Sequence, residues 1–245
     1  MSKKGFNATI NMARRDDPPM NLKDHIFYGL QLDEEQLKFR DAIYSKDYDV
    51  IFCESPAGTG KTLVSVATGM LMCEMGIYDG IVYIVSPTQE ERIGFLPGDI
   101  QSKTSIYSEP IYDALLSLGY SPECVISSTD SLESMKESGG AIIRCVPHTY
   151  MRGINFSKKF VIIEEAQNMY FDDMRKVLTR CHDDCKVVVI GNAIQCDIYK
   201  HPERSGFVPY LNRFSEEDRC FNCELKTNHR GWISTVADNF RMPES

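Results

Sequence analysis

Residues 54–62 read Glu54-Ser55-Pro56-Ala57-Gly58-Thr59-Gly60-Lys61-Thr62, and the architecture expected of the chain follows from them. An apolar run over residues 50–53 precedes this stretch, and an apolar run with helical spacing follows it over residues 63–75. A strand, a glycine loop and a helix in that order are the setting of a phosphate-binding loop, whose backbone N–H groups and helix dipole attract an anion. We therefore predict that Lys61 reaches the β- and γ-phosphates of a nucleotide and that the Thr62 hydroxyl binds Mg²⁺.

The loop departs from the usual pattern at its first position. The pattern G-x-x-x-x-G-K-[ST] has a glycine where this chain has Ser55, whereas Gly58 and Gly60 supply the permissive backbone near the phosphates. An ordinary glycine turn is the alternative that the loop by itself leaves open. The rest of the chain must therefore supply the other parts of a nucleotide site.

The composition is that of an ordinary soluble globular protein. The chain has 245 residues, of which 42% are hydrophobic and 25% are charged, and its net charge is −8. This charge argues against nucleic-acid binding over the whole surface, although a local basic groove is compatible with it. Residues 1–22 combine basic residues with a proline pair and few large apolar side chains, so we predict a flexible arm followed by one domain over residues 23–245.

Neither a membrane span nor a zinc site is required by the sequence. No apolar run is long enough to cross a membrane and no signal-type core follows the N-terminus, so we expect a cytoplasmic protein without membrane contact. The nine cysteines are typical of reduced core thiols. Cys220 and Cys223 could instead bind zinc with Cys181 and Cys185, but a strand over residues 220–225 would point the first two to opposite faces.

Strands and helices are predicted to alternate along the chain. Continuous apolar runs indicate buried strands, and apolar stripes at helical spacing indicate amphipathic helices. The strands are expected at residues 50–53, 81–85, 141–146, 160–163, 186–190 and 220–225, and the helices at residues 33–44, 63–75, 110–118, 171–181 and 232–240. This alternation predicts an α/β fold with a mostly parallel sheet flanked by helices.

Polar residues follow the predicted strands at their carboxyl ends, where ligands bind to parallel sheets. Glu164 and Glu165 end one strand, and their side chains should project differently. One carboxylate can then serve the Mg²⁺ shell while the other orients or deprotonates the attacking water. A charged helix start is the alternative for this pair. Gln195 and Asn192 follow another strand, where an amide can detect a γ-phosphate or form a turn.

Two further side chains have both a functional and a structural interpretation. Gln36 can pair with an adenine edge, but a capping box with Asp33 would also explain this residue. Arg230 can stabilise charge on a transferred phosphoryl group, and a surface ion pair is the competing explanation.

With these residues in place, the chain resembles the PhoH family of P-loop ATPases, which are similar to the first RecA-like domain of superfamily 1 helicases. The resemblance extends over about residues 24–240 and is carried by Ser55–Thr62, Gly94–Asp99, Tyr150–Gly153, Phe160–Asn168 and Gly191–Gln195. Residues 94–99, followed by the predicted helix from Pro110, are more specific to the family than the phosphate loop.

The resemblance implies ATP and Mg²⁺ as cofactors and gives each site residue a role. It implies adenine recognition by Gln36, binding of the triphosphate and Mg²⁺ by Ser55, Pro56, Ala57, Gly58, Thr59, Gly60, Lys61 and Thr62, a metal shell completed by Glu164 partly through water, a base at Glu165 and a γ-phosphate sensor at Gln195. Arg230 matches an arginine that could act across a subunit boundary. The implied assembly is a homo-oligomer, with a hexameric ring favoured.

The chain departs from the family at several positions. The family usually has aspartate where this chain has Glu164 and glycine where it has Ser55, and it often has aspartate where this chain has Asn192. A glutamate is one methylene longer than an aspartate, so it could still reach a hydrated Mg²⁺ with a shifted geometry. We therefore expect hydrolysis to be slower than the fold suggests.

The sequence supports three functions. The first is an ATPase coupled to single-stranded RNA or DNA and similar to helicases, with Arg152, Lys158 and Lys159 as candidate phosphate contacts and a solvated surface as their alternative. The second is a metabolite kinase, which should have a lid with several arginines, whereas residues 98–107 contain a single lysine. The third is a nucleotide-gated scaffold with negligible hydrolysis, which the departures at Ser55 and Glu164 favour.

Overall fold

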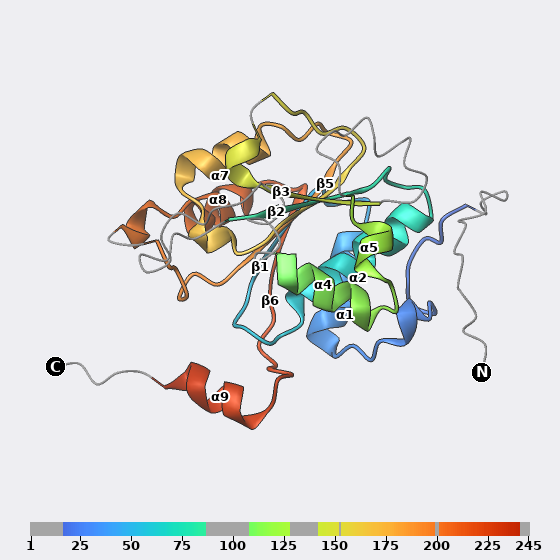
Figure 1. Ribbon diagram of the computed structural model, residues 1–245, viewed down its shortest axis with the longest axis horizontal. Coiled ribbons are helices and arrows are strands. Elements are labelled where there is room, and N and C mark those ends of the chain that lie inside the picture. Colours follow the sequence, from blue (N-terminus) through green and yellow to red (C-terminus); the bar gives the residue numbers. More distant parts are fainter. Residues whose placement is uncertain (1–16, 87–107, 128–141, 152, 199–200, 241–245) are drawn as a thin grey trace.

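A six-stranded sheet runs through the part of the chain that the computed structural model describes, which comprises residues 17–86, 108–127, 142–151, 153–198 and 201–240 (Figure 1). The strand order is β3-β2-β4-β5-β1-β6, and neighbouring strands pair in parallel. The strands are β1 (Val50–Glu54), β2 (Ile81–Val85), β3 (Ile143–Pro147), β4 (Phe160–Ile163), β5 (Lys186–Gly191) and β6 (Cys220–Glu224). The predicted sheet is confirmed, and all of these strands point in the same direction.

The inner strands are apolar because helices cover both faces of the sheet. β2, β4 and β5 are buried at every residue. In β1, Phe52 belongs to the core layer on one face, whereas Ile51 and Cys53 belong to the layer on the other face. Strands that are buried on both faces carry continuous apolar runs rather than an alternating pattern. β6, at the edge of the sheet, is only partly buried.

The helices lie in two groups, one on each face of the sheet (Figure 1). α1, α2, α4 and α5 share one core layer, and α7 and α8 share the other. The helices are α1 (Glu34–Tyr44), α2 (Lys61–Glu74), α4 (Glu109–Ser117), α5 (Pro122–Val125), α7 (Phe171–Leu178), α8 (Phe207–Phe214) and α9 (Trp232–Asn239), with 3-10 turns η1 (Phe27–Gly29), η3 (His148–Tyr150), η4 (Ala166–Asn168) and η5 (Pro202–Arg204).

Two helical predictions need correction. No helix was predicted between β5 and β6, yet α8 lies there. Its Pro209 lies in the first helical turn, where a backbone N–H has no partner within the helix. The helix predicted over residues 171–181 ends at Leu178, and a turn follows it, with the Cys181 N–H donating to the Leu178 carbonyl.

The N-terminal boundary of the packed domain lies earlier than residue 23. Leu22 is 1% exposed and belongs to the core layer of α1 and α2. The Tyr44 hydroxyl donates to the Pro19 carbonyl at 2.6 Å. Burial of a leucine side chain stabilises a fold by roughly 1.5–3 kcal/mol, so residues 19–22 belong with the domain rather than with the predicted arm.

The cysteines are free thiols, several of which lie in the core. Cys53 of β1 and Cys223 of β6 are register partners on neighbouring strands, and Cys220 lies three residues earlier on the edge strand. In the described part of the chain, no three His, Cys, Asp or Glu side chains come close enough together to hold a metal ion.

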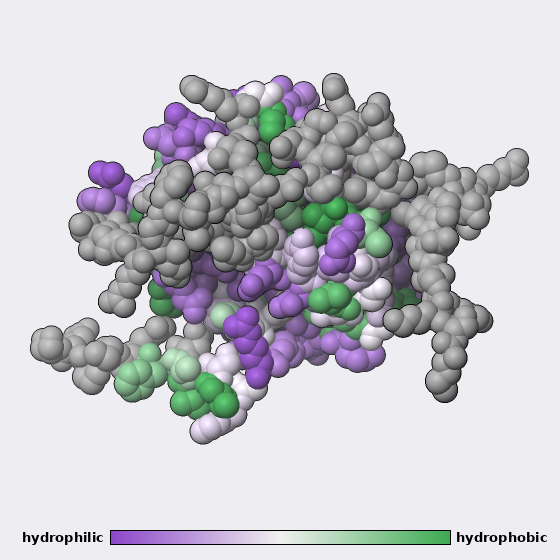
Figure 2. Space-filling view, viewed as in Figure 1, coloured by the Kyte–Doolittle hydropathy of each residue, from purple (hydrophilic) through white to green (hydrophobic). Residues whose placement is uncertain are grey.

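The last described helix, α9, extends away from the two helical layers (Figure 1). Trp232, Ile233 and Val236 are exposed on it. Figure 2 shows hydrophobic surface over this helix. Among the described helices, none combines the length and the apolar character needed to cross a bilayer.

One lysine lies inside the fold rather than at its surface. Lys186, the first residue of β5, is 2% exposed, and its ammonium group donates to the carbonyls of Ser45 and Tyr48. Burial lowers the pKa of Lys186 to about 8, while Asp49 and Asp47 offset part of this effect. Local pattern does not predict this burial, because a lysine at the start of a strand is usually exposed.

This lysine should make stability rise with pH in the alkaline range. Between pH 8 and 10.5 the unfolded chain keeps a proton on Lys186 that the folded chain has lost, so the free energy of unfolding should increase with pH by at most about 3 kcal/mol. Urea unfolding of wild type and Lys186→Met across this range measures the difference. Wild type should gain stability relative to the variant as pH rises, whereas Lys46→Met, at an exposed position, should follow wild type. Parallel curves for wild type and Lys186→Met would contradict the assignment.

Candidate nucleotide site

The loop between β1 and α2 has the backbone shape that its glycines predict. Gly58 and Gly60 have φ angles of +81° and +82°, in the left-handed region that favours glycine. A side chain at Gly60 would also meet the Gln36 amide nitrogen at 2.6 Å. α2 begins at Lys61, directly after Gly60, so the N-terminus of this helix opens onto the loop. The first N–H groups of a helix have no partner within the helix and can bind an anion.

Ser55 fits at the position where the usual loop pattern has a glycine, because the backbone there does not adopt a positive φ angle. The positive-φ residues other than glycine in the described chain are Tyr28, Lys158 and Glu165. The Ser55 side chain is 1% exposed, and its oxygen accepts the N–H of Leu225 at 2.8 Å just beyond β6. Ser55 thus fastens the start of the loop to the neighbouring edge strand.

Lys61 lies inside the loop that it is predicted to serve. It is 8% exposed, and its ammonium group donates to the Pro56 carbonyl at 3.1 Å. A buried cation with one carbonyl partner in a loop of convergent N–H groups is an arrangement that suits an anionic ligand.

Glu164 joins the phosphate loop to β4. Its Oε1 atom accepts the Thr62 hydroxyl at 3.1 Å, and its Oε2 atom accepts the Tyr83 hydroxyl from β2 at 3.0 Å. Burial, together with the neighbouring Glu165, raises the pKa of Glu164 to about 7, although Lys61 and both hydroxyls act in the opposite direction. Thr62 and Glu164, which were each predicted to serve Mg²⁺, are in contact, and Tyr83 is a partner that the sequence does not indicate.

The two oxygens have a spacing that fits Mg²⁺. Mg²⁺ binds oxygen at about 2.1 Å in octahedral geometry, which places adjacent ligands about 3 Å apart. Thr62 Oγ1 and Glu164 Oε1 are 3.1 Å apart. These two residues are therefore suited to hold a Mg²⁺ ion, Glu164 partly through water, and the ion would neutralise charge on a bound phosphate. The longer glutamate side chain does not prevent this contact.

Glu165 points elsewhere, as expected for the second of two adjacent carboxylates. It is exposed, whereas Glu164 is 3% exposed. Its backbone is left-handed, with a φ of +50°, although it is not a glycine. Such strain costs about 1–3 kcal/mol and is concentrated at functional sites. This turn separates the two carboxylates and leaves Glu165 facing solvent at the carboxyl edge of the sheet.

Gln167 is a site residue that sequence reasoning missed. It is 1% exposed, and its amide nitrogen donates to Glu165 Oε2 at 2.5 Å and to the Gln195 carbonyl at 3.2 Å. Its amide oxygen accepts the Asn192 N–H at 3.0 Å, and a side chain at Gly191 would meet that oxygen at 2.8 Å. Gln167 thus links the predicted base to the loop after β5.

The loop after β5 brings the predicted sensor into this network. Gln195 is exposed, and its N–H donates to the Asn192 carbonyl at 3.0 Å. The Asn192 side-chain oxygen accepts the Ile194 N–H at 3.1 Å, which is the turn role that its residue type favours. β5 lies between β1 and β4, so this loop ends between the phosphate loop and the two glutamates.

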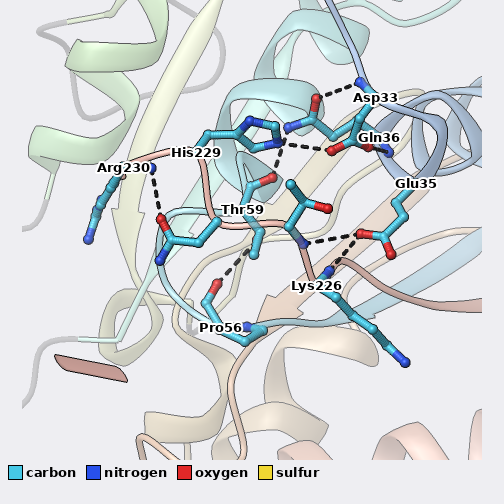
Figure 3. A network of polar contacts seen from close by, with 10 residues as sticks. Asp33, Glu35, Gln36, Pro56, Thr59, Lys226, His229 and Arg230 are labelled. Atoms are coloured by element: carbon cyan, nitrogen blue, oxygen red, sulfur yellow. Dashed lines mark hydrogen bonds and ion pairs between the residues drawn. The ribbon is translucent and has the colours of Figure 1, made fainter. Parts of the chain in front are cut away.

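The start of α1 holds the phosphate loop and the segment after β6 together (Figure 3). The predicted capping box between Asp33 and Gln36 is present. Gln36 also donates from its amide nitrogen to the Thr59 carbonyl at 2.9 Å, so its side chain has a structural role in addition to the predicted adenine contact. Glu35 accepts the Lys226 N–H at 2.7 Å, and Asp33 Oδ2 lies 2.9 Å from His229 Nε2.

Arg230 lies against the phosphate loop of its own chain. The His229 N–H donates to the Gly58 carbonyl at 2.8 Å, and a side chain at Gly58 would meet Arg230 carbons at 3.0 Å. Arg230 is exposed, and in Figure 3 its side chain extends away from Gln36 and Asp33. A role for this arginine across a subunit boundary stays a prediction.

Two of the predicted phosphate contacts lie at the opposite ends of the strands. Lys158 and Lys159 precede β4, so they are at the amino ends. Lys158 forms an ion pair with Asp79 at 3.0 Å, and Lys159 donates to the Asp79 carbonyl at 3.3 Å. Their surface interpretation is therefore the better one. Arg152 and residues 94–99 and 98–107 lie outside the described residues.

A glycine loop between a parallel strand and a helix, with a carboxylate from another strand bonded to the threonine of that loop, defines a P-loop NTPase fold with a RecA-like sheet. The chain belongs to the PhoH family, since the family model described as PhoH-like protein matches residues 31–231. The resemblance inferred from the sequence motifs is thus confirmed.

Individual relatives agree with this assignment. Protein PhoH of Escherichia coli is 34% identical over 220 residues, which are 87% of this chain and 56% of that protein. A PhoH-like protein of Bacillus subtilis is 35% identical over 157 residues, which are 63% of this chain and 46% of that protein. The chain spans about half the length of these curated relatives. The large terminase from a thermophilic bacteriophage has a TM-score of 0.51 at 17% identity, over 80% of this chain and 46% of that one, and shares the fold.

Proposed function

We propose that this protein hydrolyses ATP to ADP and phosphate with Mg²⁺, and that single-stranded RNA or DNA stimulates the turnover. The observation that carries the proposal is the contact between Thr62 of the phosphate loop and Glu164 of β4, with Glu165 beside it at the same edge. A phosphate cradle, a metal-binding pair and a second carboxylate are the parts that phosphoryl transfer to water requires.

Each residue of the site has a chemical task in this proposal. Lys61 exchanges its Pro56 carbonyl for the β- and γ-phosphates. Thr62 and Glu164 would hold Mg²⁺ once Glu164 has lost its proton, and this ion would neutralise charge on the phosphates. Glu165 accepts the proton of the attacking water. Gln167 orients the Glu165 carboxylate and connects this carboxylate to the loop that contains Gln195.

Membership in the PhoH family supports a nucleic-acid coupling, since the family is similar to helicase domains. An oligomer, with a hexameric ring favoured, would place Arg230 of one chain near the nucleotide of the next. The alternatives are a nucleotide-gated scaffold with negligible hydrolysis and a metabolite kinase, and product analysis separates all three.

Phosphate release from ATP, measured with and without single-stranded RNA at low salt, tests the proposal. We expect release that requires Mg²⁺ and increases with RNA or single-stranded DNA. Nucleotide binding without release would support the scaffold, and a phosphorylated metabolite in place of free phosphate would support the kinase. Turnover that no nucleic acid changes would disprove the coupling while leaving the ATPase in place.

A further inference from the structure

A cavity of about 390 Å³ lies between η3 and α7, and its described lining contains no residue of the nucleotide site. It is lined by His148, Thr149, Met151, Asp173, Lys176 and Arg180, and we refer to it as the α7 cavity. Ligand pockets have volumes of about 300–1,000 Å³, so the α7 cavity has room for a small ligand or for one unit of a polymer.

The charges around the α7 cavity do not balance. Lys176, Arg180 and the His148 ring supply nitrogen donors, and Asp173 is the one acid among the described lining residues. Lys176 Nζ lies 2.7 Å from Asp173 Oδ1, so this carboxylate is already in an ion pair. His148 Nε2 lies 3.6 Å from the other Asp173 oxygen, beyond hydrogen-bond distance. No carboxylate among the described residues pairs with Arg180, so within this part of the chain its positive charge is left over.

Two nitrogens at this cavity lack a close partner. Among the described residues, Nε of Arg180 and Nδ1 of His148 are buried side-chain atoms without a close hydrogen-bond partner, and the backbone of Val85 is the one group that offers the His148 ring a hydrogen bond. The His148 side chain is only 10% exposed. Nearly all buried polar groups in proteins are hydrogen-bonded, because an unpaired group loses its hydration without compensation. Unpaired nitrogens on two residues of one cavity indicate that an acceptor-rich ligand belongs there.

We propose that the α7 cavity binds a phosphate group. A phosphate offers several anionic oxygens, which match donors arriving from an arginine, a lysine and a histidine on two different segments. It would also supply the counter-charge that Arg180 lacks. The phosphate belongs either to a single-stranded nucleic-acid backbone, in which case the site rests on the proposed function, or to free phosphate.

The test compares Arg180→Gln with a matched control from α7. Arg175 is 63% exposed, pairs with Asp172 and does not line the cavity, so Arg175→Gln removes the same charge without touching the site. Binding of a short fluorescein-labelled oligouridylate is measured by anisotropy without nucleotide. Arg180→Gln should weaken binding about tenfold and lower the salt slope by about one, whereas Arg175→Gln should have little effect.

Free phosphate is the second arm of the experiment. If oligouridylate affinity is the same in wild type, Arg180→Gln and Arg175→Gln, but inorganic phosphate raises the melting temperature of wild type and not of Arg180→Gln, the site takes free phosphate. Equal responses of Arg180→Gln and Arg175→Gln in both assays, or no binding of either ligand by wild type, would overturn the proposal. Lys176→Gln, at a 63% exposed position, repeats both arms if Arg180→Gln does not fold.

These outcomes are separable from those for the ATPase. ATP turnover without RNA should be unchanged in Arg180→Gln, because this residue lies outside the nucleotide site. Wild-type hydrolysis without phosphate binding at the α7 cavity would refute the cavity alone. Binding that depends on Arg180 in a protein that does not hydrolyse ATP would refute the ATPase alone.

Discussion

Lys61→Ala should reduce affinity for ATP by about a hundredfold or more, which corresponds to roughly 3 kcal/mol. The reason is the position of this lysine, which is 8% exposed within the loop and bonded to the Pro56 carbonyl. A charge-assisted bond in a partly desolvated loop is stronger than the same bond at the surface, and alanine removes it entirely. Titration of a fluorescent ATP analogue, followed by equilibrium dialysis with ATP, measures the loss.

The control for this variant is Lys38→Ala, at an exposed position of α1. It removes the same charge from the protein while leaving the loop intact, so ATP affinity should stay close to that of wild type. Thermal unfolding of Lys61→Ala without nucleotide should show a single cooperative transition, which excludes a folding defect. Unchanged ATP affinity in a folded Lys61→Ala protein would show that the nucleotide binds elsewhere.

Glu165→Gln should bind ATP as tightly as wild type and lower turnover by about a thousandfold. Glu165 is exposed at the carboxyl edge, away from the Thr62 contact of Glu164, so the loop and the metal pair should stay intact. A glutamine has nearly the same shape but cannot accept the proton of the attacking water. Single-turnover phosphate release and ATP binding, measured on the same preparation, separate the two effects.

Glu216→Gln, exposed and just after α8, is the matched control and should leave turnover unchanged. Retained turnover in Glu165→Gln would remove this residue from the role of base. If ATP affinity fell together with turnover, Glu165 would have a structural role in its strained turn, which supports the nucleotide site, rather than the role of base.

Much of the sheet could be predicted because its strands are buried on both faces. β2, β4 and β5 are continuous apolar runs, and polar residues follow β4 and β5 at their carboxyl ends. The phosphate loop could be predicted because its glycines are needed for a left-handed backbone. α8 was not predicted, although Phe207, Tyr210, Leu211 and Phe214 recur at helical spacing, because Pro209 within this run indicates a loop.

Within the site, the sequence indicated the chemistry of residues but not their partners. Gln167 belongs to the recognised motif, yet its task follows from contacts with Glu165, Asn192 and Gln195, which lie up to 28 residues away. Tyr83 occupies an ordinary position of an apolar strand, and its bond to Glu164 depends on the neighbouring register of β2 and β4. Local pattern carries no information on such pairs.

The class of this protein follows from its sequence, because a strand, a glycine loop, a lysine and a threonine in that order leave few alternatives for a backbone that must wrap an anion. Only the folded chain shows how Ser55 replaces a glycine and which carboxylate contacts Thr62. The folded chain is also needed to show that buried nitrogens of His148 and Arg180 line the same cavity. These features arise from side chains that are distant in the chain and meet only when parallel strands bring their ends together.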